Sequence, residues 1–120
     1  MGQPVVHFEV YGKEPDQLGK FYGELFGWNV QTMPDMNYTM VRTEAGKGID
    51  GGIMAAPQGQ SNGLTFYIEV DDLRKYLERI EKVGGKTIVP PTDIPKVVSF
   101  ALFQDPQGNV VGLVASAMPE

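Results

Sequence analysis

The chain has 120 residues, no cysteine, a formal net charge of −5 and 42% hydrophobic residues, which is typical of one compact domain with its own core. The missing cysteines exclude disulfides, thiolate metal sites and cysteine nucleophiles, and the acidic balance argues against nucleic acid or a membrane surface as the main partner. There is no apolar stretch of about 18 residues and no leader-like start, so we expect a soluble, cytoplasmic protein.

The first half of the chain opens with a predicted strand followed by a predicted helix. Residues 5–10 alternate, which places His7 and Glu9 on one face of the strand and Phe8 on the other. Pro15-Asp16 is typical of a helix start, and Gly27 of a helix end. Between them, apolar residues follow the spacing of a stripe that faces a core. These residues are Leu18, Phe21, Tyr22, Leu25 and Phe26.

Three shorter strands are predicted to complete the first half. They span Trp28 to Met33, Tyr38 to Thr43 and Gly52 to Ala56. The turn-forming residues 34–37 separate the first two strands. The glycine-rich segment 46–52 lacks the spacing of a phosphate-binding loop, so we expect it to form a mobile loop near the mouth of a cleft.

The second half is predicted to repeat this order of elements. A strand at Leu64 to Val70 precedes a helix that Asp71 or Asp72 caps, and Gly84-Gly85 ends that helix. The apolar residues on its predicted core face are Leu73, Tyr76, Leu77, Ile80 and Val83. Three more strands are predicted, at residues 86–89, 97–103 and 109–116, with a strong turn signal at residues 105–109.

The two halves are related by an ungapped shift of 58 positions. This shift places His7-Phe8-Glu9-Val10 on Thr65-Phe66-Tyr67-Ile68 and Gly27 on Gly85, and it keeps apolar character at the expected core positions. We therefore expect two modules, residues 1–57 and 63–120, joined by a linker at residues 58–62. Their inner surfaces are expected to form one shared pocket.

The order of elements and three short motifs resemble the glyoxalase / bleomycin resistance / extradiol dioxygenase superfamily, also called vicinal oxygen chelate. The motifs are the segment from Phe21-Tyr22 to Phe26-Gly27-Trp28, the pair Gly84-Gly85, and the turn Asp105-Pro106-x-Gly108-Asn109. The resemblance covers essentially the whole chain. It implies an α+β fold of two βαβββ modules in tandem, with curled mixed sheets enclosing a cleft and the helices outside. It also implies a homodimer.

The resemblance further implies four positions at which metal-dependent members of the superfamily hold a divalent ion, one on the first and one on the last strand of each module. The matching residues are His7, Met54, Thr65 and Gly112. Only His7 is a competent ligand for a borderline or hard divalent ion, whereas a catalytic ion needs three or more nitrogen or oxygen ligands. We therefore expect no metal and no cofactor. The alternative is a carboxylate in a slipped register, such as Asp50 or Glu9.

His7 and Glu9 are the candidate catalytic residues, because an imidazole and a carboxylate on one strand face can exchange protons. The alternatives are a vestigial ligand for His7 and a solvated rim position for Glu9. Their repeat partners Thr65 and Tyr67 would complete a small polar cluster that orients a ligand. The expected apolar walls, which are equally ordinary core residues, are Trp28, Tyr38, Met40, Met54 and Phe100.

Three functions are compatible with these residues. The first is binding of a small organic ligand in an apolar cleft without a metal. The second is a metal-free isomerase, lyase or epimerase that uses His7 and Glu9 for proton transfer. The third is a divalent-metal enzyme with an unusual site. We favour the first, and the sequence leaves open the ligand's identity and whether the cleft lies within one chain or across a dimer.

Overall fold

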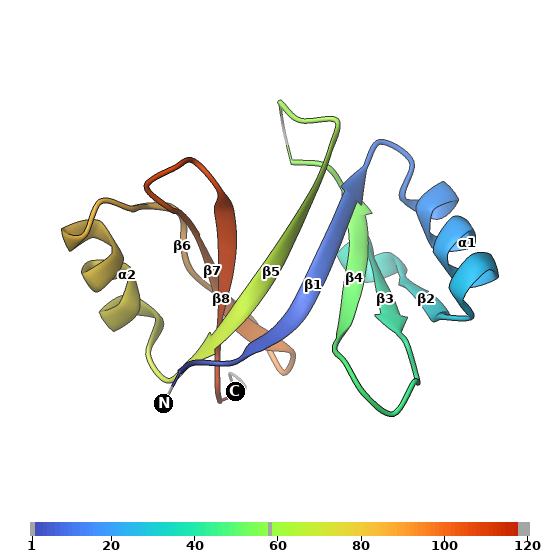
Figure 1. Ribbon diagram of the computed structural model, residues 1–120, viewed down its shortest axis with the longest axis horizontal. Helices are drawn as coiled ribbons and strands as arrows, with labels where there is room; N and C mark the ends of the chain where they lie inside the picture. Colours follow the sequence, from blue (N-terminus) through green and yellow to red (C-terminus); the bar gives the residue numbers. More distant parts are fainter. Residues whose placement is uncertain (1, 58, 118–120) are drawn as a thin grey trace. The chain divides into compact units, whose positions relative to one another are not determined.

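The computed structural model describes residues 2–57 and 59–117, which form two compact units (Figure 1). The N-terminal unit comprises the described residues between His7 and Thr65, and the C-terminal unit comprises residues 2–6 with residues 66–117. Residue 58 of the expected linker lies outside the described residues. The division into modules 1–57 and 63–120 stays a prediction.

Each unit carries one helix and four strands in the order βαβββ, so the predicted α+β class is confirmed. The first set of elements is β1 (Val5–Gly12), α1 (Pro15–Phe26), β2 (Asn29–Met33), the single-turn helix η1 (Pro34–Met36), β3 (Tyr38–Arg42) and β4 (Asp50–Ala55). The second set is β5 (Asn62–Val70), α2 (Leu73–Lys82), β6 (Lys86–Ile94), β7 (Val98–Gln104) and β8 (Val110–Ala115). Within the described residues, no helix is long and apolar enough to cross a membrane.

Both sheets are mixed and have the same internal order. In the N-terminal unit the strands lie in the order β2-β3-β4-β1, with β1 parallel to β4 and the other pairs antiparallel. In the C-terminal unit the order is β5-β8-β7-β6, with β5 parallel to β8. A parallel pair needs a crossover, and in each unit the helix and two strands supply it. A cleft shared by the units stays a prediction.

The strand register corrects the alignment of the last strands of the two units. Glu9 on β1 pairs with Gly52 on β4, and its repeat partner Tyr67 on β5 pairs with Gly112 on β8. The position that matches Gly112 is therefore Gly52, and the predicted match with Met54 is wrong. The shift of 58 fits the first strands, but the last strands are related by a shift of 60, since 112 − 52 = 60. The loops between the strands absorb the two residues.

Helix α1 begins at Pro15 and ends at Gly27, as predicted, because Gly27 adopts a left-handed φ of 71° and donates to the Gly23 carbonyl. Its core-facing stripe is narrower than predicted. Leu18 and Tyr22 pack on a core of Val10, Val41 and Ile53. The remaining residues of the predicted stripe are between 51% and 62% exposed, and they are Phe21, Leu25 and Phe26.

Two glycines on the sheet side of α1 are consistent with the outward rotation of the stripe. A Cβ atom on Gly19 would come within 3.1 Å of the Val30 side chain, which is a tight contact, and one on Gly23 would lie at an ordinary 3.4 Å from Val30. Because the small residues face the sheet, the bulky residues beside them turn toward solvent. Tyr22 instead stacks on Trp28, with ring centroids 5.3 Å apart.

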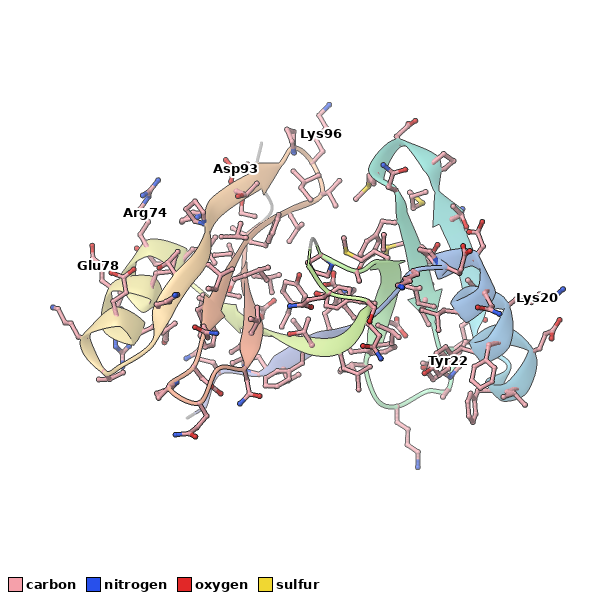
Figure 2. All side chains as sticks on the ribbon, turned by 90° about the horizontal axis from the view of Figure 1, so that it is seen from above. Lys20, Tyr22, Arg74, Glu78, Asp93 and Lys96 are labelled. Atoms are coloured by element: carbon pink, nitrogen blue, oxygen red, sulfur yellow. The ribbon has the colours of Figure 1, made fainter. Side chains whose placement is uncertain are left out.

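Helix α2 is capped by Asp72, whose carboxylate accepts a hydrogen bond from the Lys75 backbone at 3.1 Å. This settles the choice that the sequence left open between Asp71 and Asp72. The polar side of the helix, with Arg74 and Glu78, points away from the sheet (Figure 2). Its apolar side packs on one core. The buried residues of that core are Val70, Leu73, Leu77, Ala101 and Leu113.

Two details of the second half differ from the prediction. Val83 is 77% exposed, because α2 ends at Lys82 and Val83 no longer follows the helical face. Strand β6 continues through Pro90 and Pro91 to Ile94, where the sequence predicted an end at Val89. Proline is tolerated there because β6 is the last strand of its sheet order and shifts register around the prolines.

Candidate ligand-binding site on the N-terminal unit

The alternation of β1 separates a polar face from the core, as predicted. Phe8 and Val10 belong to the core beneath α1. His7, Glu9 and Tyr11 occupy the alternate positions and therefore lie on the opposite face of the sheet. A hydrogen-bond network on this face joins the three side chains through Tyr38 of β3.

Glu9 is the centre of this network. One carboxylate oxygen, Oε1, accepts a hydrogen bond from the Tyr11 hydroxyl at 2.6 Å, and Oε2 accepts one from the Tyr38 hydroxyl at 2.9 Å. Glu9 is only 6% exposed. A buried carboxylate is costly unless donors satisfy both of its oxygens, and the two phenols do this.

His7 extends the network by one hydrogen bond. Its Nε2 atom lies 2.8 Å from the Tyr38 oxygen. The single hydrogen of the Tyr38 hydroxyl is directed at Glu9, so the Tyr38 oxygen acts as acceptor toward His7 and Nε2 carries a proton. The His7 imidazole therefore donates to the Tyr38 hydroxyl, and the Tyr38 hydroxyl donates to the Glu9 carboxylate.

The imidazole is neutral at neutral pH. Burial lowers the pKa of His7 below its ordinary value of 6.5, and this effect exceeds the opposing effect of the Glu9 and Asp50 charges. Asp50 pairs with His7 in the parallel register of β1 and β4, which explains its influence. The face thus presents a neutral imidazole beside a buried carboxylate.

Strand β4 passes directly beneath the Tyr38 ring. A Cβ atom on Gly52 would overlap the Tyr38 hydroxyl and the ring carbon that carries it. On the other face of the same strand, a Cβ atom on Gly51 would come within 2.6 Å of the Phe8 ring. Glycine is therefore required at both positions, and the Gly51-Gly52 pair lets aromatic rings lie against both faces of β4.

Methionines surround the network on the same sheet face. In the strand register, Met33 pairs with Tyr38, Met40 with Gly52, and Met54 with Tyr11, and paired residues share a face. All three side chains are half-buried. We refer to His7, Glu9, Tyr11, Tyr38 and these three methionines as the methionine face.

The methionine face contains four of the predicted site residues, namely His7, Glu9, Met40 and Met54. Tyr38, expected only as an apolar wall, donates the hydrogen bond that links His7 to Glu9. Tyr11 was not among the predicted site residues, although its position two residues after Glu9 on an alternating strand places it on the same face.

The other four predicted site residues come from other segments of the chain. Trp28 packs against Phe8 and Tyr22 on the helix side of the sheet, so we leave it out of the candidate site. Thr65 is buried in β5 at the end of the N-terminal unit. Tyr67 and Phe100 belong to the C-terminal unit, on the sheet face opposite α2.

The residues of the expected metal site do not fit a divalent ion. Within residues 2–57 and 59–117, no three His, Asp or Glu side chains gather closely enough to hold one. Gly52 and Gly112, which the strand register aligns, offer no donor, and the His7 imidazole and the Glu9 carboxylate are both bonded to Tyr38. Three or more ligands of the right type are required.

A separate hollow of about 380 Å³ lies on the helix side of the N-terminal unit. It is lined by residues of α1, β2 and β3, among them Lys20, Val30 and Thr39. Val30 and Thr39 alternate with the residues of the methionine face, so this hollow and the network lie on opposite faces of one sheet.

Residues 5–113 match a family model described as Glyoxalase/Bleomycin resistance protein/Dioxygenase superfamily. The chain is 30% identical over 108 residues to a glyoxylase-like domain-containing protein of Didymella fabae, covering 84% of each chain. It is 30% identical to the anthracycline biosynthesis protein DnrV of Streptomyces peucetius, covering 73% of this chain and 38% of that protein. The chain thus spans most of the first relative but less than half of the second.

Solved structures with the same fold include two enzymes. Methylmalonyl-CoA epimerase from Mycobacterium tuberculosis superposes with a TM-score of 0.69 at 14% identity, covering 94% of this chain and 87% of that one. The Mn(II)-bound glyoxalase from Novosphingobium aromaticivorans superposes with a TM-score of 0.70 at 17% identity, covering 92% of this chain and 37% of that one. At these identities the likeness shows the fold alone.

Proposed function

The chain belongs to the glyoxalase/bleomycin resistance protein/dioxygenase superfamily, and we propose that it binds a small organic molecule on the methionine face without the help of a metal ion. One observation carries this proposal. Glu9 is buried, yet both of its oxygens accept phenol hydrogen bonds, beside a neutral imidazole and among half-buried methionines. A few convergent polar groups within an apolar lining are the usual make-up of a small-molecule site.

The methionines favour a ligand with an aromatic body. Thioether side chains are flexible and polarizable, and contacts between sulfur and aromatic rings are favourable. Met33, Met40 and Met54 come from three adjacent strands and therefore offer a broad surface to a flat molecule. The relative named for anthracycline biosynthesis supports testing polycyclic aromatic compounds first.

A panel of aromatic compounds, including one anthracycline, tests this proposal by thermal and urea unfolding. A ligand at about 100 times its dissociation constant should stabilise the protein by about 2.7 kcal/mol. We expect Met40→Ala and Glu9→Gln to weaken binding, whereas Lys13→Ala, a change at an exposed position after β1, should leave it unchanged. If no compound on the panel stabilises the wild-type protein, the proposal fails.

A second candidate function is metal-free proton transfer, as in an isomerase, lyase or epimerase. The observation that favours it is the continuous hydrogen-bond chain from His7 through Tyr38 to Glu9. Such a chain can pass a proton between an imidazole and a carboxylate through a hydroxyl, given a substrate within hydrogen-bond reach.

Hydrogen–deuterium exchange separates this candidate from simple binding. Compounds with a C–H group next to a carbonyl would be incubated with the protein in heavy water and followed by NMR. Proton transfer predicts protein-dependent exchange that Glu9→Gln and His7→Gln both abolish while the fold is retained. Binding alone predicts stabilisation by the ligand with no exchange in any variant.

We also propose that two copies of the chain associate. The exposed apolar side chains of α1, namely Phe21, Leu25 and Phe26, support this proposal, because apolar groups clustered on one surface favour association. Sedimentation equilibrium should give a dimer that Leu25→Lys weakens. A monomer over the whole accessible concentration range would contradict it.

A further inference from the structure

We infer that the Tyr38 hydroxyl occupies the point between His7 and Glu9 at which a divalent cation would lie, and that this side chain keeps metal ions out of the site. The blocked site itself, made by His7, Glu9, Tyr38 and Gly52, lies within the N-terminal unit. It holds whichever small molecule the methionine face binds.

Two metal-binding side chains converge on one atom of Tyr38. The His7 Nε2 atom lies 2.8 Å and the Glu9 Oε2 atom 2.9 Å from the Tyr38 oxygen. An imidazole nitrogen and a carboxylate oxygen are both common ligands of zinc and similar ions. With the hydroxyl in place, these atoms are held by hydrogen bonds, and the space that a cation needs is filled.

Strand β4 has no side chain at the position where the Tyr38 ring lies. A Cβ atom on Gly52 would overlap the Tyr38 hydroxyl, so residue 52 and the Tyr38 ring compete for one volume. Gly52 also pairs with Glu9 in the strand register. A carboxylate at residue 52 would therefore lie beside Glu9, and it is excluded as long as Tyr38 keeps its position.

The C-terminal unit has a similar arrangement of a glycine beneath a tyrosine ring. There, a Cβ atom on Gly112 would overlap the ring of Tyr67, its partner in the strand register. Tyr67 lies on β5, the first strand of its module, whereas Tyr38 lies on β3. Each last strand thus carries a glycine beneath a tyrosine ring, although the tyrosines are not equivalent in the repeat.

Removing the ring should expose a latent metal site, because nitrogen and oxygen donors remain on this face. His7, Glu9 and Asp50 lie on the adjacent strands β1 and β4, and Asp50 pairs with His7 in the register. Carboxylates attract divalent cations, and a neutral imidazole is the form that binds them. The double variant Tyr38→Ala with Gly52→Glu removes the obstacle and adds a third carboxylate.

The experiment is a titration with Ni²⁺ and Zn²⁺, followed by calorimetry and by NMR of the imidazole. His7 is the only histidine in the chain, so an untagged protein gives one identifiable pair of imidazole ring signals. Paramagnetic Ni²⁺ bound at this site should broaden that pair. We expect no stoichiometric binding by the wild-type protein. The double variant should bind one ion, at least about tenfold more tightly than Tyr38→Ala alone.

Two control variants make the result specific. Tyr11→Phe removes the other phenol from Glu9 but leaves Tyr38 between His7 and Glu9, so it should gain no metal binding. Adding His7→Gln to the double variant should abolish the gain. Circular dichroism and urea unfolding establish that each variant is folded, and if the double variant is not, Tyr38→Ala with Gly52→Asp, which adds a shorter carboxylate, carries the test. Stoichiometric binding by the wild-type protein, or no binding by any folded variant that lacks the Tyr38 ring, overturns the inference.

Discussion

Replacing Tyr38 with phenylalanine gives the sharpest test of the network, because it removes one oxygen atom and keeps the ring. The change deletes two hydrogen bonds, one to the Glu9 carboxylate and one to the His7 imidazole. A hydrogen bond to a charged group contributes about 1.5–3 kcal/mol, and a neutral one about 0.5–1.5 kcal/mol. Tyr38 is half-buried, so water can replace part of the loss. We therefore expect a destabilisation of about 2–3 kcal/mol.

Urea unfolding at neutral pH measures this loss. With an m-value of about 2 kcal/mol per molar, ordinary for a small protein, the midpoint should fall by about 1–1.5 M while the slope stays unchanged. Tyr76→Phe is the matched control, because the Tyr76 hydroxyl makes no hydrogen bond with any residue that the structure describes. That variant should change stability by less than about 0.5 kcal/mol.

The result for Tyr38→Phe also decides whether the phenols act together. Tyr11→Phe removes the other donor to the same carboxylate, so the two changes should be non-additive by about 0.5 kcal/mol or more. A loss below about 0.5 kcal/mol in Tyr38→Phe would refute the reasoning, since it would mean that the two hydrogen bonds of the Tyr38 hydroxyl do not stabilise the folded chain.

Three further predictions concern stability. Burial lowers the pKa of His7, so the contribution of its neutral imidazole to stability is present above pH 6.5 and should be lost as pH falls through the lower folded-state pKa. Urea unfolding across this range should show the free energy of unfolding falling with pH in the wild type and changing less in His7→Gln. Gly52→Ala should destabilise by about 1–3 kcal/mol, because its Cβ overlaps Tyr38. Gly23→Ala should instead be neutral or stabilise by up to about 1 kcal/mol, because residue 23 lies within a helix and its Cβ would meet only ordinary contacts. Equal effects of Gly52→Ala and Gly23→Ala in thermal melts would contradict this. Asp72→Ala should cost about 1 kcal/mol through the lost helix cap, whereas Asp72→Asn, which keeps a capping oxygen, should cost less by the same measurement.

Local patterns in the sequence were sufficient to predict most of the fold. The alternation around His7 and Glu9 depends only on the two-residue period of a strand, and the start at Pro15 and the end at Gly27 depend only on local backbone preferences. These features involve residues that are near neighbours in the chain. The structure confirms these local predictions and the βαβββ order that followed from them.

The rotation of α1 could not be predicted from its own residues. An apolar stripe shows which residues can face a core, but it cannot show how closely the helix approaches the sheet. The tight contact between Gly19 and Val30 of β2 decides this, and it depends on a residue outside the helix. Phe21 and Phe26 are exposed as a consequence.

By itself, the sequence determined the superfamily, the repeated βαβββ order, and a polar strand face that carries His7 and Glu9. Only the tertiary structure decided what these two side chains contact. Tyr38 lies 29 residues after Glu9, and it reaches the carboxylate because β4 lies between β3 and β1 and has a glycine at the crossing point. That contact depends on strand order and register, which are set by long-range pairing and by loop lengths rather than by local residue preferences.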